Sequence, residues 1–106
     1  MAWVMLVSAG ILEIVWAFAM KQSHGFTRIV PATITLVAMI GSFALLSFAM
    51  KSLPLGTAYT IWTGIGAIGA FLVGIVILGE VASMARIFAA MLIVSGLVLM
   101  ALSTDG

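Results

Sequence analysis

A single acidic residue lies within a long apolar stretch near the start of the chain. Glu13 is the only charged residue between Ala2 and Met20. If this stretch is a helix that enters a membrane at Ala2, the carboxyl lies about 17 Å into a hydrocarbon layer of about 30 Å. A charge at that depth costs roughly 2.5–3.5 kcal/mol, and such acids mark ion and proton pathways. We therefore expect Glu13 to bind a proton or a cation, the alternative being a protonated carboxyl that hydrogen-bonds another helix.

The helical neighbours of Glu13 are suited to a binding pocket. Residues three and four positions away share its face of the helix, and they are Ala9, Gly10, Trp16 and Ala17. Three of them are small and leave room around the carboxyl, and Trp16 offers an aromatic face. We include Gly10 and Trp16 in the lining of the expected site.

Other polar and aromatic residues are expected at a similar depth. In helices of alternating direction, Trp62 lies about 10 Å, Tyr59 about 5 Å and Ser42 about 12 Å from the surface at which Glu13's helix begins. A carboxylate, a hydroxyl and aromatic rings together suit an organic cation, which binds to the ring faces. Met39, one turn from Ser42, completes the lining. Simpler roles stay open: core packing for Met39, Trp16 and Trp62, and a bond from Ser42 to its own helix. Tyr59 could instead belong to the belt of aromatic residues at the membrane surface.

Composition indicates the elements that must position these residues. The chain is 65% hydrophobic and 7% charged, and that charge is too sparse for the surface of a soluble domain. Uncharged runs at 29–50, 52–79 and 87–104 follow the first one, and each is long enough to cross a bilayer. We predict an all-α integral membrane protein, with one domain over residues 1–106. Its four transmembrane helices are expected at about 2–20, 29–50, 56–78 and 86–103.

Several function classes are disfavoured by what the sequence holds. There is no cysteine, and no nucleophile–base pair or metal-ligand set accompanies the single buried acid. We therefore expect no enzyme, no metal site and no cofactor. A net charge of +1 gives no basis for nucleic-acid binding.

Four thin helices can barely enclose a polar cavity, so we expect a second copy of the chain as partner. Ala89, Leu92 and Gly96 share one face of the fourth helix and are candidates for the dimer contact. Glycines within the third helix, which loosen its backbone, are candidates for a kink during transport; they are Gly64, Gly66 and Gly69. Small residues on this helix could equally serve packing within one subunit.

The positive charges of the loops give little guidance on orientation. Lys21, Arg28 and Arg86 are expected on one side of the membrane, and Lys51 on the side of both termini. The positive-inside rule places the termini outside the cytoplasm, but a bias of two charges is weak. Such a chain can insert both ways round.

Two stretches of the chain resemble a known transporter family. GILEIVWA at 10–17 and KSLPLGTAYTIWTG at 51–64 are similar to the small multidrug resistance transporters. Trp16, HGFTR at 24–28 and WTGIGA at 62–67 are typical of that family's guanidinium-exporter branch. Thr60, where alanine is commoner, and Ala101, where lysine is common, depart from the branch and leave the substrate range open.

The resemblance implies an antiparallel, dual-topology homodimer in the inner membrane that exchanges protons for a cation. Both Glu13 carboxylates would share a central site, with Ser42 and Trp16 orienting them and Tyr59 and Trp62 lining the pocket. Our leading hypothesis is proton-coupled export of guanidinium and small substituted guanidinium cations. The alternatives are export of hydrophobic quaternary ammonium compounds, and, from another class, a non-transporting membrane subunit or a passive channel.

Overall fold

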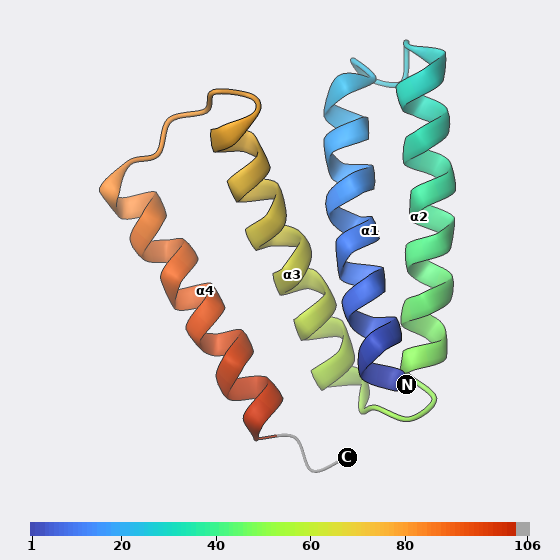
Figure 1. The fold of residues 1–106 in the computed structure, drawn as a ribbon, viewed down its shortest axis with the longest axis vertical. Coiled ribbons are helices and arrows are strands. Elements are labelled where there is room, and N and C mark those ends of the chain that lie inside the picture. Colours follow the sequence, from blue (N-terminus) through green and yellow to red (C-terminus); the bar gives the residue numbers. More distant parts are fainter. Residues whose placement is uncertain (104–106) are drawn as a thin grey trace.

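The computed structural model, described here over residues 1–103, consists of four antiparallel α-helices joined by short loops (Figure 1). The helices are α1 (Ala2–Gln22), α2 (Ile29–Ala49), α3 (Leu55–Val76) and α4 (Met84–Leu102). Each is long and apolar enough to cross a membrane, which confirms the predicted number of membrane helices. Their ends differ from the expected ones by at most two residues. Asp105 lies outside the described part.

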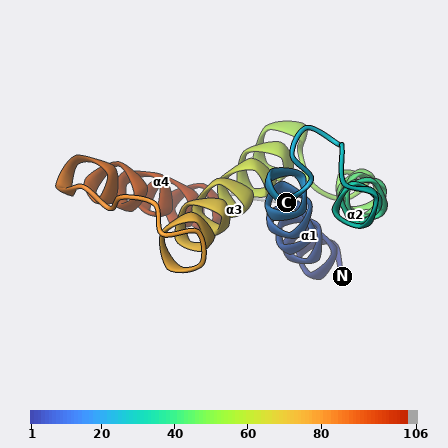
Figure 2. The same cartoon turned by 90° about the horizontal axis from the view of Figure 1, so that it is seen from above.

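The four helices form a flat layer. Seen from above, they follow one another in the order α2, α1, α3, α4 (Figure 2). The described chain measures 43 × 34 × 16 Å. Since an α-helix with its side chains is about 10–12 Å across, the layer is little more than one helix thick. A single layer of this kind leaves both of its faces without a covering helix.

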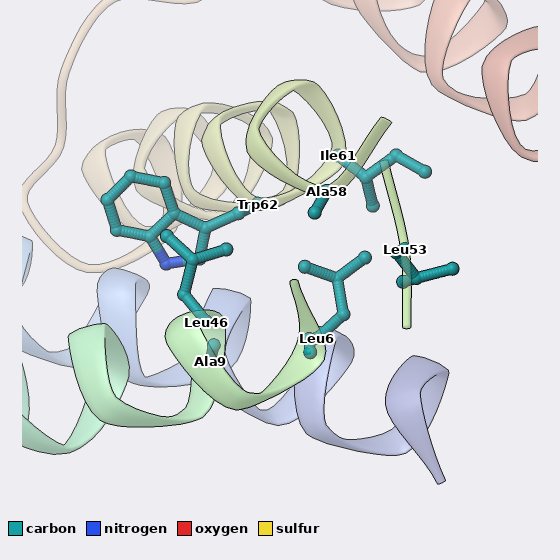
Figure 3. Packing of buried hydrophobic residues seen from close by; sticks show 8 residues of the cluster. Leu6, Ala9, Leu46, Leu53, Ala58, Ile61 and Trp62 are labelled. Atoms are coloured by element: carbon teal, nitrogen blue, oxygen red, sulfur yellow. The ribbon is translucent and has the colours of Figure 1, made fainter. Parts of the chain in front are cut away.

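The buried core lies where α1, α2 and α3 meet, near the N-terminal end of α1. Leu6 of α1 points toward Ala58 and Ile61 of α3, and Leu46 of α2 lies beside Trp62 (Figure 3). Leu6 and Ala58 are completely buried. Alanine at such a contact lets the helix backbones approach closely, because little side chain stands between them.

The fourth helix lies at the edge of this core. Leu97 and Met100 pack against the core cluster, but among residues 1–103 the α4 backbone lies close to that of α3 only, and no α4 residue is buried. α3 itself lies close to α1 near the N-terminus of the chain and diverges from it toward the loop before α4 (Figure 1). Most of α4 is therefore free to contact lipid or another protein.

Candidate functional site

The Glu13 side chain lies in the contact between α1 and α3, directly against Gly66. A Cβ atom at position 66 would overlap the Cδ and Oε1 atoms of Glu13, so only glycine leaves room for the carboxyl there. Oε1 is buried and has no hydrogen-bond partner among the described residues. A buried polar atom without a partner is rare and calls for a functional or structural reason. A bound proton donor or cation would satisfy this oxygen.

A second buried polar atom without a partner lies one turn away on the same helix. The indole Nε1 of Trp16 is buried and makes no hydrogen bond within the described part of the chain. Trp16 is three positions after Glu13, so both side chains are on the same side of α1. The site therefore offers one free acceptor and one free donor.

Ser42 links three helices through hydrogen bonds. Its hydroxyl donates to the backbone carbonyl of Ala9 on α1 at 2.7 Å and accepts from Trp62 Nε1 on α3 at 2.9 Å. Ser42 is completely buried. Its hydroxyl proton therefore goes to α1 rather than to its own helix, and no hydrogen bond among residues 1–103 joins Ser42 to Glu13. What the structure brings together is Ser42 and Trp62.

Four aromatic rings form a continuous row across α1, α2 and α3. The ring centroids of Trp16 and Phe43 are 6.5 Å apart, those of Phe43 and Trp62 5.8 Å, and those of Trp62 and Tyr59 5.5 Å. The first two pairs are edge-to-face, a favoured arrangement of aromatic rings, and the third is tilted. Phe43 is 47% and Tyr59 is 52% exposed, so the row is open to a ligand or to a second subunit.

Phe43 is the residue that sequence reasoning missed. It follows Ser42 directly and lies at the same depth in the membrane, and this was the available signal. Met39, four positions before Phe43, is half-buried. The structure thus places Met39 one turn from the aromatic row.

The glycines of the expected site are explained by close packing. A Cβ at Gly10 would lie 2.7 Å from Cγ2 of Ile65, so this glycine allows α1 and α3 to cross closely. A Cβ at Gly69 would overlap Ile14 of α1, and one at Gly64 would overlap Leu97 of α4. The small residues of α3 therefore pack within one subunit. α3 is an unbroken α-helix in this state, and its kinking stays a prediction.

The residues expected at the dimer contact are free in the single chain. Ala89, Leu92 and Gly96 of α4 are all exposed, Leu92 by 58%. Nothing lies within 4 Å of a Cβ built at Gly96. This face is available to a partner helix.

The Ser42 hydrogen bonds predict a cost for Ser42→Ala. The substitution leaves the buried Trp62 N–H without an acceptor, so the free energy of unfolding should fall by about 1–3 kcal/mol. The indole N–H resonance of Trp62 should also move. The matched control is Ser95→Ala, because Ser95 is exposed and donates only to Met91 of its own helix at 2.8 Å. Equal effects of the two substitutions would contradict the bridging role of Ser42.

Comparison with known proteins shows the family of the chain. The family model described as Small Multidrug Resistance protein matches residues 1–93. A guanidinium exporter from Yersinia pseudotuberculosis is 59% identical over 98 residues, covering 92% of this chain and 94% of its own. Guanidinium exporters from Escherichia coli and Citrobacter freundii are 57% and 56% identical over 104 residues, covering 98% of this chain and 99% of theirs. The chain is therefore a multi-pass membrane protein of the small multidrug resistance family.

Proposed function

We propose that the protein exports guanidinium and small substituted guanidinium cations in exchange for protons, and that both are bound by Glu13. The observation that carries the proposal is the buried, unpartnered oxygen of this carboxyl, set against Gly66 in the middle of the helix layer. The names of the related exporters support the same substrate. The protein is thus proposed to be a transporter rather than an enzyme.

Guanidinium matches the groups around Glu13. It is planar and permanently charged, and it can donate two parallel N–H bonds to one carboxylate. Aromatic faces attract such a cation when its charge is removed from water. Trp16, one turn from Glu13, begins a row of rings that continues through Phe43 and Trp62 to Tyr59 and can supply such faces. Trp16 is three positions after Glu13 and is proposed to orient its carboxylate, although no hydrogen bond joins the two side chains in this structure.

Exchange follows from competition for one carboxyl. A protonated carboxyl has lost the charge that attracts the cation, and a carboxylate paired with guanidinium resists protonation. The site therefore holds a proton or a cation, and each crossing with one leads to a return with the other. A proton gradient directed into the cell then drives the cation out.

The same site is proposed to require two copies of the chain. A layer only 16 Å thick cannot surround a hydrophilic cation, because both of its faces are uncovered. A second copy of the chain would cover the face at which the cation binds. The exposed face at Ala89, Leu92 and Gly96 is suited to the contact because small residues permit close helix packing. Weak charge bias between the loops allows the copies to insert in opposite orientations.

The test is transport by purified protein in liposomes. When the vesicles are more acidic inside than outside, the protons that leave them should drive guanidinium in. When guanidinium is added outside without a proton gradient, its entry should drive protons out. Tetramethylammonium, which cannot donate hydrogen bonds, should be a poorer substrate. Preference for tetramethylammonium would favour a quaternary ammonium exporter, and guanidinium flux that ignores the proton gradient would identify a passive channel.

A further inference from the structure

A cavity of about 330 Å³ lies between α1 and α3, in the half of the molecule where these helices diverge. At its inner end it is lined by Ala17, one turn after Glu13, and by Ala67, which follows Gly66. At its outer end it is lined by Lys21, Glu80 and Arg86. The cavity thus extends from the level just beyond the Glu13 carboxyl to the loop between α3 and α4.

The position of Glu80 at this outer end is fixed by the way α3 ends. Gly79 has a φ of +71°, a left-handed conformation that favours glycine, and it turns the chain back on the helix. The backbone N–H of Glu80 then donates to the carbonyl of Gly74 at 2.9 Å. The Glu80 carboxylate lies against Gly74, where a Cβ atom would overlap its Oε1. Two glycines therefore place this acid over the last turns of α3.

The other charges at this end of the cavity are both positive. The Arg86 guanidinium lies 5.7 Å from the centre of the Phe71 ring and donates to the carbonyl of Val81 at 3.4 Å. No ion pair joins Glu80 to Lys21 or Arg86 among residues 1–103. The negative charge of Glu80 is therefore not paired with a single positive group. It lowers the electrostatic potential over the whole outer end of the cavity. Without it, this end would present two positive charges to an approaching cation.

We propose that Glu80 attracts small cations electrostatically to the outer end of the α1/α3 cavity. It offsets the charges of Lys21 and Arg86 on the route to Glu13, and so raises the rate at which a cation arrives. Fields of this kind change association rates by factors of ten or more and are weakened by salt. The proposal rests on cation transport at Glu13, the proposed function above.

The test compares Glu80→Gln, Glu80→Asp and the double variant Glu80→Gln/Arg86→Gln in liposomes, by the initial rate at which added guanidinium drives protons out of the vesicles. At about 0.01 M salt, where the Debye length is about 30 Å, Glu80→Gln should slow this rate by about threefold to tenfold. At about 1 M salt the deficit should largely disappear. Glu80→Asp should keep most of the rate, and the added Arg86→Gln should restore it. Equilibrium binding of guanidinium should change far less than the rate.

Lys51→Gln is the control for a charge change elsewhere. Lys51 lies in the loop between α2 and α3, at the opposite end of the bundle, with its Nζ 4.9 Å from the centre of the Phe48 ring. This variant should show the salt dependence of the wild type. A Glu80→Gln rate equal to that of the wild type at low salt, or a deficit that neither salt nor Arg86→Gln relieves, would overturn the role of Glu80 alone. Absence of guanidinium-driven proton movement in the wild-type protein would instead overturn the proposed function, and this proposal with it.

Discussion

Glu13→Gln is expected to reduce proton-driven guanidinium transport to the level of protein-free liposomes. Glutamine has nearly the shape of glutamic acid and fits the space beside Gly66, but it cannot take up a proton or offer a negative charge to a cation. The folded protein should not be less stable, because the substitution removes a charge whose cost within a bilayer is roughly 2.5–3.5 kcal/mol. Transport and thermal unfolding, measured on the same preparation, check both statements.

Glu13→Asp is the control for this variant. It keeps the ionisable group and shortens the side chain by one methylene, which withdraws the carboxyl from Gly66. Exchange should continue at a reduced rate and remain coupled to protons. Coupled transport by the Gln variant would show that another group carries the exchange.

Gly66→Ala is expected to produce the second large loss. The added Cβ would overlap the Glu13 carboxyl, so the end of that flexible side chain must move away. A displacement of about 1 Å at a reacting or binding group can cost about a hundredfold in rate, and we expect transport to fall by about tenfold to a hundredfold. The helix should tolerate the change, because alanine favours the helical conformation over glycine by about 1 kcal/mol.

Gly56→Ala is the matched control on the same helix. Nothing lies within 4 Å of a Cβ built at Gly56, so this variant should transport like the wild type. The pair separates the contact with Glu13 from a general need for glycine in α3. If Gly66→Ala transports as well as Gly56→Ala, the position of the Glu13 carboxyl against Gly66 is not required for transport.

The helices could be predicted because charges mark their ends. Lys21 and Arg28 lie at the two ends of the first loop, and Lys51 lies in the second loop. Glu80 lies in the third loop, and Arg86 lies in the first turn of α4. Placing these charges within the hydrocarbon is costly, so the uncharged runs between them must be the spans. The helix ends in the structure follow these charges closely.

The faces of the helices could be predicted only in part. Depth along the bilayer follows from counting residues, and it brings Ser42 and Trp62 to similar levels. The rotation of each helix about its own axis does not follow from counting residues, because helices that are apolar all round have no polar side to orient them. Phe43 was missed for this reason, and so was the bond from Ser42 to Ala9.

The roles of the glycines required the packing of neighbouring helices. Gly66 and Gly69 read as flexible positions in the sequence, but in the structure their missing side chains leave room for Glu13 and Ile14. The missing side chain of Gly74 likewise leaves room for Glu80, which reaches it because Gly79 turns the chain back. Contacts made by a folded-back loop depend on backbone geometry that composition does not specify.

The central claim, that a proton and a guanidinium cation compete for the Glu13 carboxyl, is tested most directly by proton release on binding. Purified protein in lightly buffered detergent is mixed with guanidinium while pH and heat of binding are recorded together. The account predicts that binding releases protons, that the apparent affinity falls as the pH is lowered, and that Glu13→Gln releases none. Guanidinium binding that releases no proton anywhere between about pH 5 and pH 8 would contradict it.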